Sequence, residues 1–196
     1  MKTKRPYTMR VRAEQAEQTR LRIVGAVLGL AMERPLAACT LPSVAERAQV
    51  SVQTVLRIFG SRDELFAEAI ERTAADVLAE RPADPDDPSA SVAALVDHYE
   101  LRGDGVLLLL GQEAWEPVAA AAVGRGKAEH RRWVATVFAP HLEPLDGARR
   151  DQVLDLLVAA TDVSAWKLWR RDAGRTRDET LERMLALVAA VTRHLA

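Results

Sequence analysis

Residues 40–59 read T-L-P-S-V-A-E-R-A-Q-V-S-V-Q-T-V-L-R-I-F and contain two candidate helix starts. Thr40 is a good N-cap for a short helix, and Pro42 falls in its first turn, where a missing N–H costs nothing. Ser51 is a second N-cap, and it closely follows Ala48 at the end of the first helix. The stretch therefore predicts two short helices joined by a tight turn.

Apolar residues recur three and four positions apart in both helices, so each helix has one apolar face. The small side chain of Ala45 lets the second helix cross close to the first. The residues that we expect in the core are Val44, Ala45, Ala48, Val50, Val55 and Phe59. This arrangement is the helix-turn-helix pattern, in which the second helix enters the major groove of DNA.

The net charge of −1 conceals an asymmetry along the chain. Residues 1–62 contain 11 Lys and Arg against 4 Glu, for a charge of +7, whereas residues 63–196 contain 16 basic and 24 acidic residues, for a charge of −8. A basic first third joined to an acidic remainder indicates a nucleic-acid-binding head on a body that does not bind nucleic acid. The alternative is a solvated basic tail without a partner.

The chain has 196 residues, enough for one large domain or two small ones with a sizeable core. Hydrophobic residues make up 48% of it and aromatic residues only 5%, a composition that favours helices. Cys39 is the single cysteine, which excludes an internal disulfide and fits a reducing compartment. We see no secretory signal, and apolar runs such as Val106–Leu110 are too short to cross a bilayer. We therefore expect an all-α, cytoplasmic protein.

The first 16 residues have no apolar period and are rich in Lys and Arg. We expect a flexible basic arm over residues 1–16, which either reaches along the DNA backbone or into a minor groove, or is an inert terminus. The first helix is expected from about Glu17 to Glu33. Its apolar side is formed by Ile23, Val27 and Leu30.

Several pieces of sequence stand in a recognisable order around this motif. Thr19-Arg20 leads into the first helix, residues 40–59 follow the pattern T-L-x-x-V-A-x-x-A-x-V-S-x-x-T-V-x-x-x-F, and S-R-D-E-L-F comes next at residues 61–66. In this order and spacing, about residues 17–78 resemble the DNA-binding domain of the tetracycline-repressor (TetR) family. The resemblance implies a three-helix helix-turn-helix domain at the N-terminus, followed by a helical ligand-binding and dimerisation domain.

Three positions depart from the usual pattern of that family. Gln49 stands where a turn glycine is common, so we expect the turn to adopt a conformation that a non-glycine residue tolerates. Leu56 stands where a tyrosine often touches DNA, and Ile58 stands where a tyrosine or histidine often donates to a phosphate. The last two changes remove polar contacts, so affinity or base preference should differ from that of a typical member.

Geometry and the resemblance together suggest eight DNA-contacting residues: Thr40, Ser51, Val52, Gln53, Thr54, Leu56, Arg57 and Arg62. Gln53 is the best candidate for a base contact, because its amide can pair bidentately with adenine. Val52 and Leu56 would pack on thymine methyl groups, and the hydroxyl and Arg side chains would contact phosphates, which position the protein without specifying sequence. The alternatives are helix capping for Thr40 and Ser51, and a solvated surface position for Arg57.

The remaining sequence predicts a helical body. Ser61 to Glu64 form a capping box that opens a helix over residues 61–79. The predicted map is an arm at 1–16, a DNA-binding domain at 17–80, a Pro- and Asp-rich linker at 81–90 and a body at 91–196. Within the body, helices are expected over 91–102, 106–115, 117–138, 148–170 and 177–195, with Gly103-Asp104-Gly105 as a break and a soft spot at 124–126.

The last two predicted helices carry more apolar surface than a body of this size can cover. The helix at 148–170 is apolar on two sides, and the helix at 177–195 has a continuous apolar face. A four-helix contact in a two-fold homodimer would cover both, and the family resemblance implies the same arrangement. A dimer would also read two DNA half-sites about one helical turn or more apart, as in a palindromic operator.

No catalytic set, metal site or cofactor motif stands out in the sequence. The four histidines have no metal-ligand spacing with one another or with Cys39, and the Gly124-x-Gly126-Lys127 sequence falls far short of a phosphate loop. We expect no enzymatic activity, in agreement with the family resemblance.

The resemblance implies a small-molecule effector site in the body. Large rings with a few polar groups suit such a pocket, and the candidates are His98, Tyr99, Arg102, Trp115, His130, Trp133 and Trp166. For each tryptophan, the alternative is an ordinary core position.

The sequence thus predicts a ligand-responsive DNA-binding transcriptional regulator, a repressor that its effector releases from DNA. Two alternatives are an architectural DNA-binding protein of weak specificity, which the apolar Leu56 and Ile58 suggest, and an enzyme or carrier that has lost DNA binding. The ratio of specific to nonspecific DNA affinity at fixed salt separates the first two.

Overall fold

The computed structural model describes residues 4–194, with the side chains of residue 11 and residues 13–193. Within this range the chain is helical and has no strand, which confirms the all-α fold class. The chain divides into two compact units, Met1–Thr73 and Ala74–Ala196, which we call the head and the body. The sequence analysis placed the boundary in the loop at 81–90, whereas the division lies inside a helix.

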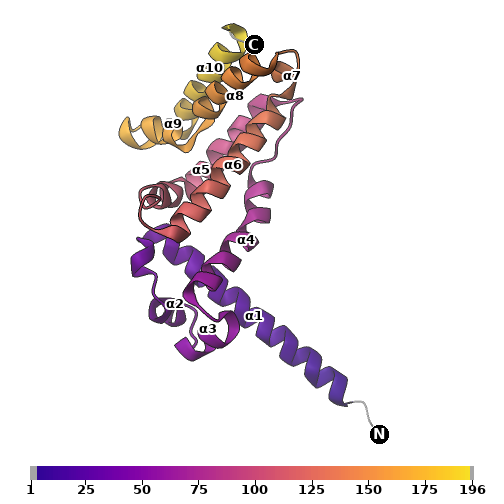
Figure 1. The fold of residues 1–196 in the computed structure, drawn as a ribbon, viewed down its shortest axis with the longest axis vertical. Helices are drawn as coiled ribbons and strands as arrows, with labels where there is room; N and C mark the ends of the chain where they lie inside the picture. The colour runs from indigo at the N-terminus through magenta and orange to yellow at the C-terminus, as the bar shows by residue number, and fades with distance from the viewer. Residues whose placement is uncertain (1–3, 195–196) are drawn as a thin grey trace. The chain divides into compact units, whose positions relative to one another are not determined.

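The head contains four α-helices and a short 3-10 turn (Figure 1). They are α1 (Lys4–Glu33), η1 (Leu36–Ala38), α2 (Leu41–Arg47), α3 (Val52–Phe59) and α4 (Arg62–Glu80), the last of which continues into the body. The buried core residues of the head include Ile23, Val27, Leu30, Val44, Val55, Phe59, Leu65 and Phe66. Each helix of the head therefore contributes to one common core.

The first helix is longer than predicted. It begins at Lys4, so the expectation of a flexible arm over residues 1–16 is wrong for residues 4–16, while residues 1–3 lie outside the described part. This segment contains no glycine, and Pro6 falls in the first helical turn, where proline is tolerated. Its Arg, Glu, Gln and Ala residues have high helix propensity even without an apolar stripe. The prediction failed because it required a hydrophobic period.

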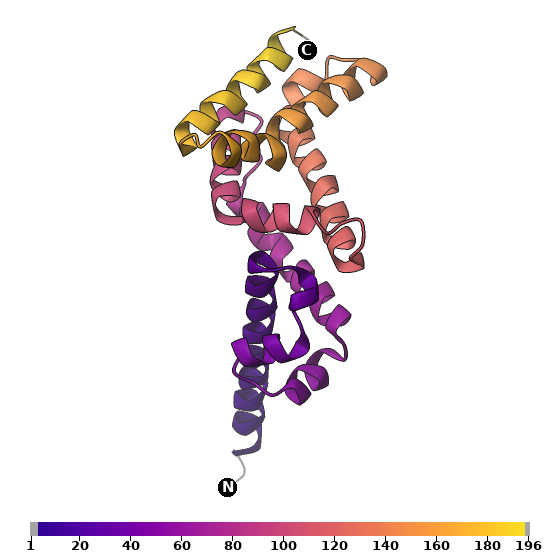
Figure 2. The same ribbon diagram turned by 90° about the vertical axis from the view of Figure 1, so that its left-hand side faces the viewer.

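The body contains the remaining helices. They are α5 (Pro88–Leu110), α6 (Pro117–Val137), α7 (Ala139–Leu142), α8 (Gly147–Thr161), α9 (Val163–Lys167), the π-helical turn η2 (Leu168–Asp172) and α10 (Arg177–His194). In this bundle α5 packs against α6 and α10, and α8 packs against the same two helices; Figure 2 gives the view turned by 90°. Leucine, valine and aromatic side chains from all these α-helices form its core.

The predicted break at Gly103-Asp104-Gly105 does not occur, because α5 runs through it. A Cβ atom at Gly103 would lie 2.5 Å from Cζ3 of Trp166, so glycine is the residue that lets this helix approach the indole ring. Asp104 forms an ion pair with Arg171, with 2.8 Å between Oδ1 and Nε. Gly103 thus allows close helix packing and does not break the helix. Helix α6 likewise continues through the predicted soft spot at 124–126.

The predicted helix at 148–170 is interrupted at Asp162. This residue ends α8 in an extended conformation and caps α9, because its side chain accepts a hydrogen bond of 2.8 Å from the Ser164 N–H. Thr161, just before it, is buried and donates to the Leu157 carbonyl at 2.8 Å. Asp in this position is a cap signal that the continuous apolar stripes concealed. No helix in the described part of the chain is long and apolar enough to cross a membrane.

Two glycine substitutions test the packing of α5. Gly103→Ala should lower the free energy of unfolding by about 1–3 kcal/mol, because the new methyl group overlaps the Trp166 ring. Gly124→Ala is the matched control, since nothing lies within 4 Å of its Cβ position in α6, and it should raise stability by about 0.5–1 kcal/mol. Urea denaturation of both variants measures the difference. Equal effects of the two substitutions would contradict this account.

Candidate nucleic-acid interface and the polar cluster of the body

Both helices of the helix-turn-helix start as predicted. The Thr40 hydroxyl oxygen accepts a hydrogen bond of 3.3 Å from the Ser43 N–H, with Pro42 in the first turn of α2. The Ser51 hydroxyl oxygen accepts one of 3.1 Å from the Thr54 N–H at the start of α3. These caps satisfy backbone donors that a short helix leaves open. They confirm the sequence interpretation of α2 and α3.

The turn between α2 and α3 has a left-handed residue. Gln49 has a φ of 54°, so it adopts the conformation that glycine usually supplies, instead of the one that a side chain prefers. The turn is closed by a hydrogen bond of 2.9 Å from the Val50 N–H to the Ala45 carbonyl. This short closure fixes the direction in which α3 leaves the turn.

The two sides of α3 differ in exposure. Val55 and Phe59 are buried in the head core, whereas Gln53 and Arg57 are exposed and Leu56 is 41% exposed. Val52, Thr54 and Ile58 lie half-buried between these sides, and so does Val50, which was expected in the core. The outward face of α3 thus presents an amide, an alkyl chain and a guanidinium.

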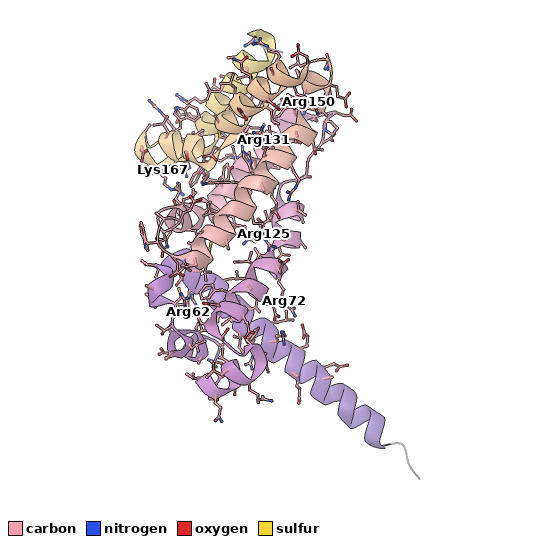
Figure 3. The ribbon with its side chains drawn as sticks, in the orientation of Figure 1. Arg62, Arg72, Arg125, Arg131, Arg150 and Lys167 are labelled. Atoms are coloured by element: carbon pink, nitrogen blue, oxygen red, sulfur yellow. The ribbon has the colours of Figure 1, made fainter. Side chains whose placement is uncertain are left out.

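Arg62 has a different environment from the one that the sequence suggested. Its guanidinium Nη2 donates to the Leu36 carbonyl at 2.7 Å, Nε donates to the Cys39 carbonyl at 3.3 Å, and its Cζ lies 4.7 Å from the ring centroid of Phe66. These contacts hold the η1 turn against the start of α4. Figure 3 labels Arg62 on the ribbon. Arg62 therefore has a structural task, and Arg57 is the exposed cation of α3.

Ion pairs tie α1 to α4 beside α3. Arg20 pairs with Glu68, with 2.6 Å between Nε and Oε1, and its guanidinium lies 4.9 Å from the ring centroid of Phe59 at the end of α3. Arg72 pairs with both Glu68 at 2.9 Å and Glu17 at 3.1 Å. Arg20 therefore links all three helices, which orients α3 within the head.

In the body, two of the predicted effector residues meet at the end of α4. The carboxylate of Glu80 lies 2.7 Å from His98 Nδ1 and accepts a hydrogen bond of 2.7 Å from Arg102 Nε. Hydrogen bonding with Arg102 holds the pKa of the Glu80 carboxyl below its ordinary value. The sequence analysis missed Glu80, although its position at the end of a helix that enters the body is a signal that could have found it.

A second group of predicted residues surrounds Arg81. His130 stacks on Trp133, with ring centroids 5.9 Å apart, and its Nδ1 lies 3.4 Å from Arg81 Nη1. The Trp133 N–H donates to the Arg81 carbonyl at 3.0 Å, and the Tyr99 hydroxyl donates to the Thr161 carbonyl at 3.0 Å. These side chains are buried, so α4, α5, α6 and α8 meet at one polar cluster within the body.

Two predicted effector residues have other environments, although the Trp166 ring centroid lies 6.0 Å from that of Tyr99. Trp115 is 72% exposed in the turn after α5. Trp166 is fully buried, its N–H donates to Glu100 at 2.9 Å, and the Arg171 guanidinium lies 4.5 Å from its ring centroid. Trp166 is therefore a core residue, as the alternative for each tryptophan stated.

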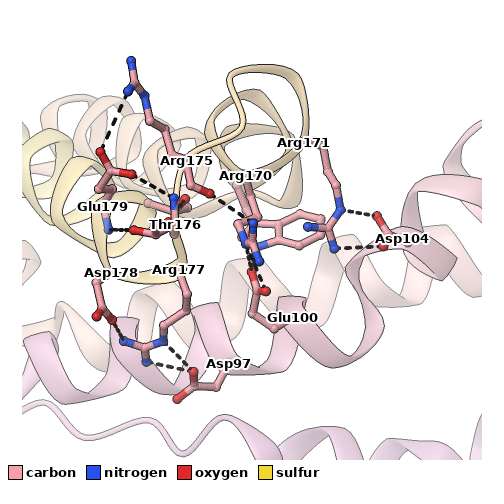
Figure 4. Close-up of polar contacts among 12 residues, drawn as sticks. Asp97, Glu100, Asp104, Arg170, Arg171, Arg175, Thr176, Arg177, Asp178 and Glu179 are labelled. Atoms are coloured by element: carbon pink, nitrogen blue, oxygen red, sulfur yellow. Dashed lines mark hydrogen bonds and ion pairs between the residues drawn. The ribbon is translucent and has the colours of Figure 1, made fainter.

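A row of ion pairs fastens the chain after α9 to α5 (Figure 4). The pairs are Arg170 with Glu100 at 2.9 Å, Arg171 with Asp104 at 2.8 Å and Arg177 with Asp97 at 2.8 Å. The acidic residues follow one another at positions three and four apart and so share one face of α5. They hold η2 and the start of α10 in place.

Burial changes the protonation of the two histidines in the cluster. Burial, followed by the nearby charge of Arg81, lowers the pKa of His130 to about 4. Burial also lowers the pKa of His98, although the Glu80 carboxylate opposes the shift. Both imidazoles are therefore neutral at pH 7. No cluster of metal-ligating side chains occurs among the described residues.

The fold and the head define the class of protein: an all-helical chain with an N-terminal helix-turn-helix and a separate helical body. Residues 23–69 match the family described as bacterial regulatory proteins, tetR family. The likeness to this family therefore lies in the head, and it spans the helix-turn-helix.

Two relatives illustrate the likeness. An HTH-type transcriptional repressor of Streptomyces coelicolor, SCO4008, is 27% identical over 104 residues, which cover 53% of this chain and 52% of the relative. The match thus spans about half the length of that curated relative. The crystal structure of a transcriptional regulator from Rhodococcus sp. Rha1 is similar with a TM-score of 0.67 at 20% identity, over 88% of this chain and 95% of that one. This second likeness concerns the fold alone.

The low pKa of His130 predicts acid sensitivity. The unfolded chain takes up a proton on His130 near pH 6.5 and the folded chain only near pH 4, so stability is lost as pH falls through this window. The loss should be about 3 kcal/mol, and His98 adds to it with the same sign. His130→Gln should remove that part of the pH dependence. Urea unfolding between pH 4 and 7.5 measures it, and an unchanged slope in the variant would refute the assignment.

Proposed function

We propose that this protein is a sequence-specific DNA-binding transcriptional regulator, a repressor that leaves a palindromic operator when a small molecule binds to its body. The observation that supports this most strongly is the two-sided α3 helix. Its buried side is fixed in the head core by Val55 and Phe59, while Gln53, Leu56 and Arg57 are left free on the opposite side. A rigid helix with an outward amide and guanidinium is the arrangement that major-groove readout needs.

The roles on α3 follow from the chemistry of its exposed side chains. The amide N–H of Gln53 can donate to adenine N7 while its amide oxygen accepts from the adenine N6 amino group, and this bidentate contact would make Gln53 a reader of A·T pairs. Leu56 would pack against a thymine methyl, and Arg57 would pair with a phosphate. The Thr40 and Ser51 hydroxyls are exposed beside the helix starts, where phosphates approach, and we retain them with Val52 and Thr54 as further contacts.

TetR-family regulators bind DNA and act as dimers. In this chain, Leu156 of α8 and Leu187 of α10 are exposed although these two helices pack together in the body. Paired exposed leucines on neighbouring helices suit a self-complementary four-helix contact. We assign the homodimer interface to α8 and α10 on this basis.

The effector acts through a shift between two populations of the body. Helix α4 begins in the head and ends in the body, where Glu80 is held by α5 and Arg81 by α6. A ligand that rearranges these contacts changes how the end of α4 is held. In a dimer this would alter the spacing of the two heads and so their match to the half-sites.

A weakly specific architectural role is the second candidate. The half-buried Ile58 and the exposed Leu56 favour it, because neither can donate to a phosphate or a base. Such a protein would bind any duplex through its basic residues with little difference between sequences.

Selection of binding sites from random duplex DNA with the purified protein tests the proposed function. A palindromic consensus supports a sequence-specific dimer. Salt-sensitive binding to all duplexes without enrichment would favour the architectural role, and no DNA binding at all would refute both.

Substitutions on α3 separate reading from positioning. Gln53→Ala should reduce discrimination at one base pair by about 1–3 kcal/mol, because the bidentate contact is lost. Arg57→Ala should weaken binding to all duplexes alike. It should also reduce the slope of log affinity against log salt concentration by the amount that about one phosphate contact contributes. Fluorescence anisotropy with the selected site and single-base variants measures both. Sequence preference that changes in Arg57→Ala and not in Gln53→Ala would reverse these roles.

A charge on α10 tests the dimer interface. Leu187 is 42% exposed, so Leu187→Asp costs little in a monomer but would bury an unpaired carboxylate in the four-helix contact. The variant should sediment as a folded monomer. Leu101→Asp is the control, because Leu101 of α5 is 69% exposed and lies outside the proposed interface. If both variants remain dimeric in sedimentation velocity, the interface lies elsewhere.

A further inference from the structure

Arg81 is a buried charge without a carboxylate partner. It directly follows the last residue of α4 and is only 5% exposed. Its Nε has no hydrogen-bond partner, and its Nη1 makes one long contact of 3.4 Å with His130 Nδ1. In the part of the chain that the structure describes, Arg81 forms no ion pair, and the adjacent Glu80 is engaged by Arg102 and His98.

The hydrogens of the surrounding cluster can be assigned, and the side chain that contacts the Arg81 guanidinium, His130, is neutral. Because a guanidinium only donates, His130 Nδ1 accepts from Arg81, so the imidazole proton sits on Nε2 and points to the Thr161 hydroxyl at 3.1 Å. The Thr161 hydroxyl donates onward to the Leu157 carbonyl. The Tyr99 hydroxyl and Trp133 N–H donate to backbone carbonyls. The carboxylates of Glu129 and Glu80 act on the Arg81 charge from a distance, but neither forms an ion pair with it.

An unpaired guanidinium in such a place is unfavourable. Arginine does not lose its proton in proteins, so the charge persists although burial lowers its pKa. A buried charge is normally paired or bound to a ligand, since isolation from water without a counter-charge is strongly destabilising. An anion that accepted hydrogen bonds from Arg81 would therefore be favoured at this position.

The edge of the guanidinium that carries Nε indicates the kind of anion. Nη1 faces His130, whereas the unpartnered Nε belongs to the other edge, where a carboxylate can accept two parallel hydrogen bonds. Rings of His98, Tyr99, His130 and Trp133 form the rest of the cluster, with His98 and Tyr99 centroids 5.7 Å apart. Flat apolar groups pack well among such rings, whereas a multiply charged anion would meet a single cation.

We propose that Arg81 binds the carboxylate of a small organic monocarboxylic acid, whose apolar part lies among the rings of the cluster. One part of this inference rests on the proposed function, namely that this acid is the effector of the regulator. Because the Arg81 backbone also accepts from Trp133, a ligand that pulls on this residue acts directly on the end of α4. The cluster is buried, so binding requires the body to open, as a population shift does.

Thermal unfolding of the full chain at constant ionic strength tests the site. The probes are acetate, benzoate and octanoate, with benzamide and octanamide as uncharged counterparts and inorganic phosphate as a different anion. At ten times its Kd, a carboxylate that fits should raise Tm by about 2–6 °C, and its amide should not. A panel in which no carboxylate raises Tm, or in which phosphate or the amides act equally well, overturns the proposal.

Two variants assign the effect to Arg81. Arg81→Met should unfold at no lower temperature than the wild type, because an uncompensated charge is removed, and it should lose the carboxylate response. Arg102→Met is the matched control, since Arg102 is paired with Glu80; it should lower Tm and retain the response. Arg81→Met that fails to fold, or that retains the response, contradicts the proposal. Arg81→Lys keeps the charge without the planar fork and should retain only a weakened response.

The outcomes distinguish this site from the proposed function. If the wild type binds its operator but shows no carboxylate effect that depends on Arg81, the proposed function stands and the proposed carboxylate site is refuted. If the carboxylate effect depends on Arg81 but the protein binds no DNA, the proposed carboxylate site stands and the proposed function is refuted. Carboxylates that release the selected DNA from the wild type and not from Arg81→Met support both.

Discussion

The arrangement depends first on the burial of one side of α3. A helix of eight residues cannot hold itself in water, so its direction must come from what it packs against. Val55 and Phe59 supply that packing in the head core, and Arg20 adds its ion pair with Glu68 and its stacking on Phe59. The outward side chains of α3 can be used for recognition because the inward ones leave the helix no other orientation.

A second constraint operates at the end of α4. Two consecutive residues are held by different helices of the body: Glu80 by Arg102 of α5, and Arg81 by Trp133 of α6 through its backbone. The first contact is a paired charge, and the second leaves a guanidinium unpaired. Under the proposed function, this difference gives the helix shared by head and body one stable attachment and one that the proposed ligand would alter. We regard it as the physical basis for a response to an effector.

Local signals made the head predictable, and long-range packing made the body less so. Thr40, Ser51 and the apolar spacing located α2 and α3 correctly, because caps and periodicity are encoded within a few residues. Gly103 looked like a helix break, since nothing in the sequence places Trp166 against it. Arg81 was overlooked for a similar reason: its burial among His130 and Trp133 depends on contacts about fifty residues away in sequence.

The central claim is that α3 reads a sequence. The most direct test compares the affinity for the selected duplex with that for a scrambled duplex of equal length at the same salt concentration, for the wild type and Gln53→Ala. We predict a ratio of about 10³ or more for the wild type, which falls in the variant. A ratio near one for the wild type, with affinity set by salt alone, would contradict the claim.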